Sequence, residues 1–403
     1  MALVPVDEAL ARILEHGRPV TDFETLSLTE ADGRVLAEDL VARLTQPPFN
    51  ASAMDGYAVR AEDATEGTAL AVVGISAAGA AWPGVVGRGQ AVRIFTGAPV
   101  PAGADAIVIQ EDTELLGEDR IRVTQTAAPA RHIRRKGQDF TAGETVLKAG
   151  MVMDYARLTL AAAMDHATLS VRRKPLVAIL ATGDELVHPG EARGSDQIVA
   201  SSLYGTAAFA KAAGADVLDL GIARDTKADI AAAIQRAIDA KADLLVTLGG
   251  ASVGDHDLVQ PVLKDLGMTL DFWRIAMRPG KPLMVGRLGA MQVLGLPGNP
   301  VSTLVCSLLF LEPLIRQRAG LPPVRRAATA LAATDLSAND HRQDYLRARL
   351  ETDADGRLFA TPAPKQDSSQ MKILARSDCL IIRPPNAPPL AAGNPCPILR
   401  LRP

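Results

Sequence analysis

Three turns between residues 182 and 257 place acidic residues beside glycines, each directly after an apolar run. Glycines let backbone N–H groups approach an anion, and the helix after such a turn offers the positive end of its dipole. Clustered carboxylates beside a phosphate-binding loop indicate a hydrated Mg²⁺ that bridges ligand phosphates. Helix capping is the competing interpretation for each acid alone, since Asp and Ser are favoured N-caps; three such turns together favour a ligand site. The residues concerned are Thr182, Gly183, Glu185, Asp225, Gly249, Gly250, Ser252, Gly254, Asp255 and Asp257.

Two proline-containing loops come later in the chain. The loop RPGKP, residues 278–282, carries Arg278 and Lys281 on a stiff backbone. Two cations on such a loop suit phosphate or another oxyanion, although most Lys and Arg side chains simply lie in solvent. The loop LPGNP contains Pro297 and Pro300 and predicts a tight turn that opens a helix. On its own, a structural turn explains this second loop.

A third group of candidate residues lies in the first half of the chain. The string SAMDGYA contains Asp55, whose Asp-Gly step also fits a hairpin turn. Thr96 precedes another glycine, and the run RRKGQD begins at Arg134 and ends at Asp139. A charge run of this kind is usually a solvated surface. Nothing local indicates that these residues meet the glycine-rich turns.

Alternating strands and helices must hold these turns and loops in place. Residues 174–321 alternate between apolar runs of strand type and helical segments, which predicts an α/β domain with a parallel sheet and right-handed crossovers. Ligands of such sheets bind at the carboxyl ends of the strands. The predicted strands are LVAILATG, ADVLDLGI, ADLLVTLGG and the segments near 282–286 and 292–296; the predicted helices are 201–213, 228–240, one after Asp257, and 301–318.

The remaining chain divides by texture into three further parts. Residues 1–42 and 141–173 predict helical segments, with an amphipathic helix near Val6 and a second short helix after Thr29. Residues 43–140 are rich in Gly, Pro and Val and predict a β-rich module. Residues 322–403 predict a C-terminal β domain of short strands and Pro-rich turns.

Composition excludes several classes of function. The 403 residues are 48% hydrophobic and 22% charged, and 43 Lys+Arg against 46 Asp+Glu leave a net charge of −3. No basic excess supports nucleic-acid binding, and 3% aromatic residues provide few stacking platforms. Three scattered cysteines, a start that does not resemble a signal peptide, and no long apolar run indicate a cytoplasmic protein without a membrane span. No P-loop, GxGxxG string or zinc-spaced His pair occurs.

Seven strings occur in one order along the chain: NASAMDGYAVR, IFTGAPVPAGADAIV, IRRKGQDF, ATGDEL, GGASVGDHD, RPGKP and GLPGNPVS. Together they resemble the molybdopterin molybdenumtransferase family, the bacterial MoeA type that is related to the gephyrin E domain. The resemblance extends from about residue 5 to 385. It implies a multidomain α/β fold: a three-layer α/β molybdopterin-binding domain, one discontinuous helical domain made of residues 1–42 and 141–173, an inserted β domain of residues 43–140, and a C-terminal β domain.

The resemblance also implies an activity and partners. Members of the family insert molybdate into adenylyl-molybdopterin and release AMP, which forms molybdenum cofactor. They are homodimers in which the inserted β domain of one subunit shares the active cleft of the other. Further partners implied are the molybdopterin adenylyltransferase and the molybdoenzymes that receive the cofactor; neither nucleic acid nor a membrane is implied.

Matching position by position, the resemblance implies roles for single residues. Catalytic roles fall on Asp55, Asp139, Glu185, Asp225 and Asp257; Mg²⁺ ligation falls on Glu185, Asp225 and Asp257; and substrate binding falls on Thr96, Arg134, Thr182, Gly183, Gly249, Gly250, Ser252, Gly254, Arg278, Lys281, Pro297, Pro300, Arg347 and Ser369. The match at Ser369 is weaker, because SSQMKILARSD departs from the family pattern. The family often has Lys where this chain has Arg274 and Arg278, so a planar fork replaces a point charge there.

These roles combine into a hypothesis of mechanism. Mg²⁺ near Glu185, Asp225 and Asp257 grips the adenylate phosphates, and Lys281 with Arg278 attracts molybdate. Three alternatives stay open on the sequence: an adenylyltransferase of the same pathway, which shares only the α/β domain; a gephyrin-like scaffold that binds without turnover; and a generic nucleotide-binding regulator, which binds a ligand and forms no product.

Overall fold

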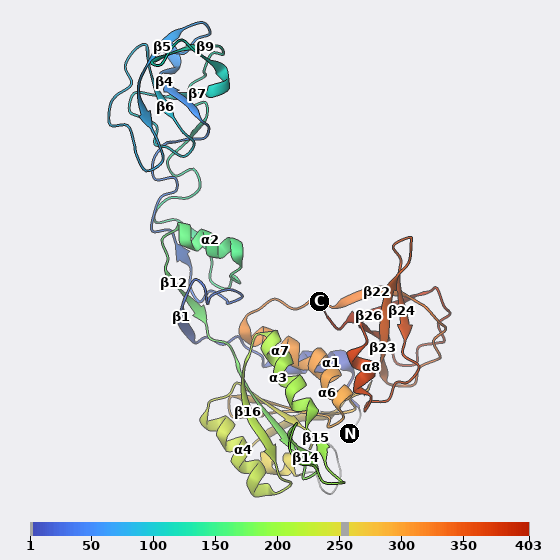
Figure 1. Cartoon of the computed structure of the whole chain (residues 1–403). Helices are drawn as coiled ribbons and strands as arrows, with labels where there is room; N and C mark the ends of the chain where they lie inside the picture. Colours follow the sequence, from blue (N-terminus) through green and yellow to red (C-terminus); the bar gives the residue numbers. More distant parts are fainter. Residues whose placement is uncertain (1–2, 251–257, 403) are drawn as a thin grey trace. The chain divides into compact units, whose positions relative to one another are not determined.

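The computed structural model describes residues 3–250 and 258–402. The chain divides into two compact units, of which the first is Met1–Asp22 with Arg172–Pro403 and the second is Phe23–Val171. Figure 1 colours the chain along its sequence and labels the elements. The second unit is therefore inserted in the sequence of the first, and each is described by itself.

The first unit contains a mixed β-sheet in the order β16-β13-β17-β21-β20-β18. Neighbours among β16, β13, β17 and β21 are parallel, as predicted, whereas β20 and β18 run antiparallel to their neighbours. The antiparallel part arises because residues 289–290 alone join β20 to β21, and a tight turn with Gly289 at φ 61° leaves no length for a crossover. The strands are β13 (Leu176–Thr182), β16 (Asp216–Ala223), β17 (Leu244–Leu248), β18 (Thr269–Arg274), β20 (Pro282–Leu288) and β21 (Met291–Leu296).

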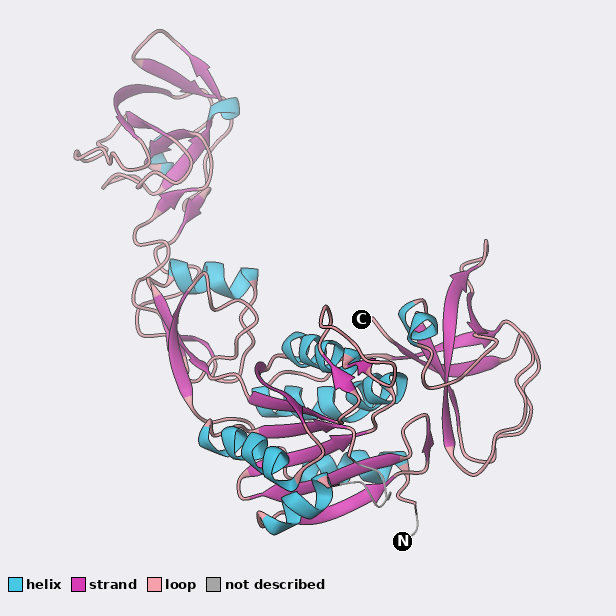
Figure 2. Ribbon diagram, turned by 60° about the horizontal axis from the view of Figure 1, so that its bottom comes forward, coloured by secondary structure: helices cyan, strands magenta, loops and turns pink. Residues whose placement is uncertain are grey.

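Helices cover both faces of this sheet, which makes three layers (Figure 2). Side chains alternate along β13, so that Val177 and Ile179 enter one core and Ala178 and Leu180 enter the other. Gly214, at φ 107°, ends α3 as predicted. The first core contains α1 (Val6–Glu15), α3 (Ser201–Ala213), α6 (Pro300–Cys306), the π-helical turn η3 (Ser307–Leu311) and α7 (Glu312–Ala319); the second contains α4 (Lys227–Asp239) and α5 (Val259–Asp265).

The amino-terminal segment differs from the prediction of one discontinuous helical domain. Val6, Ala9 and Ile13 form the buried stripe of α1 and lie in the core of the α/β sheet, not with residues 141–173. No helix follows Thr29: Ser27 and Glu30 close a turn through hydrogen bonds, and the chain then becomes extended. A stripe of apolar residues thus predicts a helix but not the core against which it packs.

The second unit has a helix-containing part and a β part. In the first, α2 (Tyr155–Ala163), the pair β1 (Phe23–Ser27) and β12 (Thr168–Arg172), and the pair β2 (Leu40–Val41) and β11 (Thr145–Leu147) surround a core that includes Leu36 and Met153. The β part is a sheet in the order β7-β4-β6-β5-β9-β8, beside the short pair β3 (Ala51–Ser52) and β10 (Ile133–Arg134). Its elements are β4 (Gly56–Val59), η1 (Ala61–Asp63), β5 (Ala69–Ser76), β6 (Gln90–Ile94), β7 (Ala106–Ile109), η2 (Gln110–Asp112), β8 (Thr113–Leu115) and β9 (Arg120–Val123).

The carboxyl-terminal part of the first unit is a β domain, as predicted. Because β25 pairs with β23 as well as with β26, the strands of this domain form a closed barrel. One further strand, β19 (Met277–Arg278), comes from the loop of the α/β domain and joins this sheet beside β23. The elements are β22 (Ala327–Ala332), β23 (Gln343–Thr352), β24 (Leu358–Pro362), α8 (Met371–Ala375), β25 (Cys379–Arg383) and β26 (Pro395–Arg400).

Within residues 3–250 and 258–402, no helix combines the length and the apolar character that a membrane crossing requires.

Candidate functional site

The predicted turns gather at one edge of the α/β sheet. The parallel strands β13, β17 and β21 end there at Thr182, Leu248 and Leu296. Because β20 is antiparallel to β21, its first residue, Pro282, lies at the same edge. The sheet register therefore brings together four loops that span more than 110 residues of the sequence.

A cavity of about 470 Å³ opens at this edge. Thr182, Glu185, Gly249, Pro297 and Asn299 contribute to its wall. The short parallel pair β14 (Leu186–Val187) and β15 (Ile198–Val199) contributes Leu186, Ile198 and Val199 to the same wall. The volume is typical of sites for small molecules. The cavity lies at the carboxyl end of β13. After β13 the chain forms β16 on one side of it and β17 on the other, so the strand order reverses here. Ligands of open α/β sheets bind at such a switch point.

The turn after β17 requires glycine. Gly249 has φ 89° and Gly250 has φ 65°, a region that L side chains rarely adopt. A Cβ atom on Gly250 would lie 2.2 Å from Cγ2 of Val259 on α5. The Gly249 N–H donates to the carbonyl of Leu296 at 3.1 Å, which joins this turn to the end of β21. Ser252, Gly254, Asp255 and Asp257 follow and lie outside the described residues.

The two described acids of the turns have different surroundings. Glu185 lies on the cavity wall, and its carboxylate folds over Gly183, where a Cβ atom would lie 2.5 Å from Oε2. Asp225 joins its turn to that of Asp184: the Asp184 N–H donates to Asp225 Oδ2 at 3.4 Å, and the Asp225 N–H donates to Asp184 Oδ1 at 3.1 Å. The structure thus brings the two turns together as predicted.

A complete metal centre is not present in the part of the chain that the structure describes. No three His, Cys, Asp or Glu side chains among residues 3–250 and 258–402 are grouped to hold a metal ion. Glu185 and Asp225 supply carboxylate oxygens from neighbouring turns, while Asp257 is outside the described residues. Mg²⁺ usually takes one or two carboxylates together with water and substrate phosphates, so this donor chemistry fits the ion.

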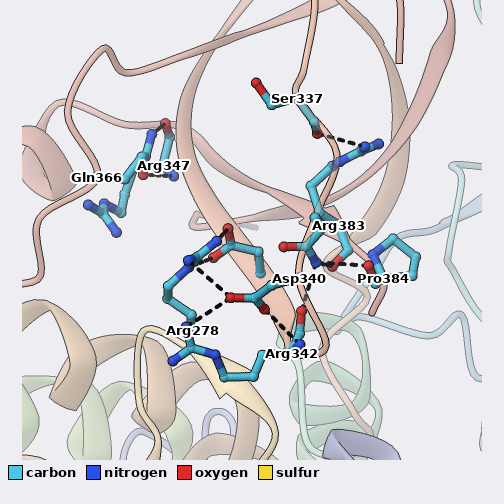
Figure 3. Close-up of polar contacts among 10 residues, drawn as sticks. Arg278, Ser337, Asp340, Arg342, Arg347, Gln366, Arg383 and Pro384 are labelled. Carbon is cyan, nitrogen blue, oxygen red and sulfur yellow. Dashed lines mark hydrogen bonds and ion pairs between the residues drawn. The ribbon is translucent and has the colours of Figure 1, made fainter. Parts of the chain in front are cut away.

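The loop of residues 278–282 presents its two cations differently, and Figure 3 shows the contacts of Arg278. Arg278 Nε and Nη2 donate to the two carboxylate oxygens of Asp344, at 3.0 and 2.5 Å, and Nη1 donates to Asp340 at 3.4 Å. The hydrogen bond to Asp344 raises the pKa of Arg278. Lys281 is exposed. An anion that approached Arg278 would therefore compete with two carboxylates, whereas Lys281 faces solvent.

A segment of the C-terminal β domain meets the start of α6. Asn299 Nδ2 donates to Ser368 Oγ at 3.1 Å, and the Val301 N–H donates to the Ser368 carbonyl at 3.2 Å. Thr303 Oγ1 donates to the carbonyl of Pro297, which holds the turn at the cavity wall. The residues after Ser368 therefore lie close to the edge at which the cavity opens.

Arg347 is the most deeply buried arginine of this domain, with 1% of its surface exposed. Its Nη2 donates to the carbonyl of Asp367 at 3.1 Å, and its Nε has no hydrogen-bond partner among the described residues. Burial lowers the pKa of Arg347. Ser369 donates its hydroxyl and its N–H to Asp367 Oδ1, at 2.6 and 2.8 Å, and thereby lowers the pKa of Asp367. Asp367 thus links Arg347 to Ser369, two residues that only the family resemblance had marked as site residues.

The candidate residues of the inserted β domain belong to the second unit. Asp55 accepts two hydrogen bonds from Thr96, from its N–H at 2.7 Å and from its hydroxyl at 2.9 Å. These bonds, and then the charge of Arg93, lower the pKa of Asp55. Arg134 lies on β10 beside Ala51, and the Asp139 N–H donates to the carbonyl of Gln46 at 3.0 Å. The structure joins Asp55 directly to Thr96 and places Asp139 at a separate point of the unit.

Sequence reasoning missed the polar partners that hold the candidate residues. These are Asp340, Asp344, Asp367, Asn299 and Ser368. Asp367 and Asp340 carried a local signal, because each accepts from the N–H two residues later, as in a side-chain-closed turn. The contacts of Asp344 with Arg278 and of Asn299 with Ser368 join segments far apart in the sequence, which no local pattern indicates.

Known proteins resemble the whole chain. Residues 4–164 match the model of the MoeA N-terminal region (domain I and II), residues 178–317 match a probable molybdopterin binding domain, and residues 329–401 match the MoeA C-terminal region (domain IV). Molybdopterin molybdenumtransferase of Haemophilus influenzae is 34% identical over 398 residues, which are 97% of each chain. Molybdopterin molybdenumtransferase 2 of Mycobacterium tuberculosis is 38% identical over 397 residues, 96% of each chain. The crystal structure of a molybdopterin biosynthesis moeA protein from Pyrococcus horikoshii OT3 matches with a TM-score of 0.82 and 26% identity, covering 99% of this chain and 100% of that chain.

Proposed function

Since the chain belongs to the molybdopterin molybdenumtransferase family, we propose that it inserts molybdate into adenylyl-molybdopterin, releases AMP and forms molybdenum cofactor. It is thus a transferase of molybdenum cofactor biosynthesis. The observation that carries the proposal is the cavity at the carboxyl ends of β13, β17 and β21, with the glycine turn of Gly249 on its wall. Backbone N–H groups of such a turn bind phosphate, and the adenylate supplies phosphates.

Divalent metal is part of the proposal. Glu185 and Asp225 would hold Mg²⁺ together with the adenylate phosphates, and Asp257 is the third candidate ligand. When bound, the ion polarises a phosphoryl oxygen and assists cleavage of the anhydride. The turn of Thr182 and Gly183 orients Glu185 for this role, because Gly183 leaves room for the carboxylate to fold back.

Molybdate would bind near Lys281 and Arg347, neither of which forms an ion pair in the described parts of the chain, with Ser369 linked to Arg347 through Asp367. A buried guanidinium whose Nε has no hydrogen-bond partner is a strong donor to an oxyanion, since the anion would replace solvation that the fold has removed. Arg278 contributes less directly to molybdate binding, because its guanidinium already donates to the Asp344 carboxylate. Pro297 and Pro300 shape the wall on which the substrate rests.

The remaining elements of the proposal concern assembly. We propose a homodimer in which Asp55, Thr96, Arg134 and Asp139 act at the site of the partner subunit. The two hydrogen bonds from Thr96 lower the pKa of Asp55 and so favour its carboxylate form. We also propose contact with the adenylyltransferase and with recipient molybdoenzymes. Buried, unpaired cysteine thiols fit a reducing cytoplasm.

The test is AMP release from adenylyl-molybdopterin with Mg²⁺, with and without molybdate. Release that depends on molybdate and yields active cofactor is the expected result. Glu185→Gln should lower the rate at least about tenfold at fixed Mg²⁺, as loss of a ligand or of its support does at other metal sites. The matched control is Asp216→Asn, which removes an exposed acid at the opposite edge of the same sheet.

Two outcomes would redirect the assignment. Synthesis of the adenylate from ATP and molybdopterin would favour the adenylyltransferase, although the matches on both sides of the α/β domain disfavour it. Binding of the adenylate without turnover would favour a scaffold.

A further inference from the structure

One short strand ties the cavity loop to the C-terminal β domain. Residues 277–278 leave the α/β sheet after β18 and pair in parallel with β23, Met277 beside Gln343 and Arg278 beside Asp344. The Gln343 N–H donates to the carbonyl of Ala276 at 2.8 Å. The backbone on the amino-terminal side of Lys281 is therefore part of the C-terminal sheet.

A bidentate ion pair reinforces this strand. Asp344 is 6% exposed and accepts from Arg278 through both carboxylate oxygens. Such fork-to-fork pairs fix the orientation of both groups as well as their distance. Asp340 supports the pair from the side and is itself held by Arg342, whose N–H and Nη2 donate to it at 2.8 and 3.0 Å (Figure 3).

The loop beyond Arg278 has little room to move. The Ile275 N–H donates to the carbonyl of Lys281 at 3.0 Å, which closes the loop on itself. Gly280, at φ 116°, packs so closely that a Cβ atom would lie 2.6 Å from Sγ of the buried Cys306. Pro282 then enters the cavity wall. A displacement of Arg278 would thus move Lys281, three residues later.

The charges of this cluster balance. Arg278 and Arg342 face Asp340 and Asp344, so that two positive groups meet two negative ones. Lys281 forms no ion pair within residues 3–250 and 258–402, and it keeps its full attraction for an anion. The pairing therefore assigns different tasks to the two cations of the loop.

We infer that Asp344 is a positioning residue for oxyanion binding: it anchors Arg278 in the C-terminal sheet, and this holds Lys281 at the edge of the cavity as the cation that meets molybdate. The inference rests on the proposed function. It assigns Asp344 a part in the reaction without contact to the reacting atoms, and it makes the Arg278 guanidinium an anchor for the loop.

The test compares Asp344→Asn, Arg278→Gln and the double variant by steady-state kinetics with molybdate and adenylyl-molybdopterin varied in turn. Asp344→Asn keeps the shape of the buried side chain, and Arg278 is half-exposed, so its charge reaches water. The expected result is a KM for molybdate raised about tenfold in each single variant, as for other orienting partners, with the KM for the adenylate unchanged. Because both variants break one contact, the double variant should match the singles. Asp344→Glu should restore part of the affinity.

A control separates positioning from lost stability. Glu312→Gln breaks another bidentate pair of the same unit, in which the acid is as buried as Asp344 and neither Glu312 nor its partner Arg326 lines the cavity. It should lower Tm and leave both KM values unchanged.

Three results would overturn the inference. A lower KM for molybdate in Asp344→Asn would make the released Arg278 the binding cation. An unchanged KM would remove Asp344 from oxyanion binding, and a rise in both KM values that Glu312→Gln reproduces would reduce it to a structural residue. A wild-type enzyme without molybdate-dependent AMP release would instead refute the proposed function.

Discussion

Replacing Gly250 by alanine tests the geometry of the turn after β17. The residue has φ 65°, where an alanine costs about 1–2 kcal/mol. The new Cβ would also lie 2.2 Å from Cγ2 and 2.8 Å from Cβ of Val259, and overlap of this kind in a packed region costs about 1–3 kcal/mol. Together we expect the free energy of unfolding to fall by about 2–5 kcal/mol, which is roughly 4–10 °C in Tm for a unit of this size.

Gly289→Ala is the matched control for this substitution. Gly289 has φ 61°, but nothing lies within 4 Å of the point that a Cβ atom would occupy, so only the backbone cost of about 1–2 kcal/mol applies. Urea and thermal denaturation of both variants isolate the overlap as their difference. Because the turn also borders the cavity, Gly250→Ala should raise the KM for the adenylate, whereas Gly289→Ala should not.

A double-mutant cycle with Val259→Ala gives the sharpest check. Truncating Val259 removes the atom that the new methyl group meets, so the double variant should be more stable than the sum of the single effects predicts, by roughly 0.5–3 kcal/mol. Additive effects, or a Gly250→Ala variant as stable as Gly289→Ala, would refute the reasoning.

Three further predictions concern charged groups. Arg347→Met should raise the KM for molybdate by roughly 10–100-fold, the loss expected for a charge-assisted hydrogen bond, while Tm stays close to that of the wild type because an apolar chain replaces a buried charge. The hydrogen bonds from Arg342 lower the pKa of Asp340 to about 2, from 3.8, so its contribution to stability is complete above pH 4 and is lost as the pH falls towards 2. The stability difference between wild type and Asp340→Asn in urea should therefore shrink over that interval; a constant difference would contradict it. Thr96→Val should raise the pKa of Asp55, because one of its two donors is lost; carboxyl NMR titration of wild type and variant measures this, and an equal pKa would exclude the hydroxyl as a cause.

The pattern of apolar residues predicted an element correctly where it was compatible with only one type of secondary structure. The runs of β13 and β17 are buried on both faces, and Gly214 ends α3 where the sequence indicates. The prediction of a purely parallel sheet was incomplete, because it ignored how short the link from β20 to β21 is. The second helix predicted after Thr29 was wrong, because capping residues also close an isolated turn.

The sequence predicted the part of the candidate site that depends only on the order and direction of the strands. Carboxyl ends of parallel strands share an edge, so Thr182, Glu185 and Gly249 had to be neighbours. The bond of Arg278 to Asp344 was not predictable, since it depends on a strand that changes sheets. The same holds for Arg347, whose burial results from the closure of a separate β domain.

The insertion of the second unit has a consequence for synthesis on the ribosome. Helix α1 leaves the ribosome first, but its core partners on β13 follow only after about 150 residues of the other unit, which takes roughly 7–30 s at ordinary elongation rates. A ten-residue helix is marginal alone in water, so its apolar stripe waits exposed during that time. The second unit, whose residues are consecutive, is synthesised in full before β13, so all the residues of its core are available before the core of the α/β sheet can form.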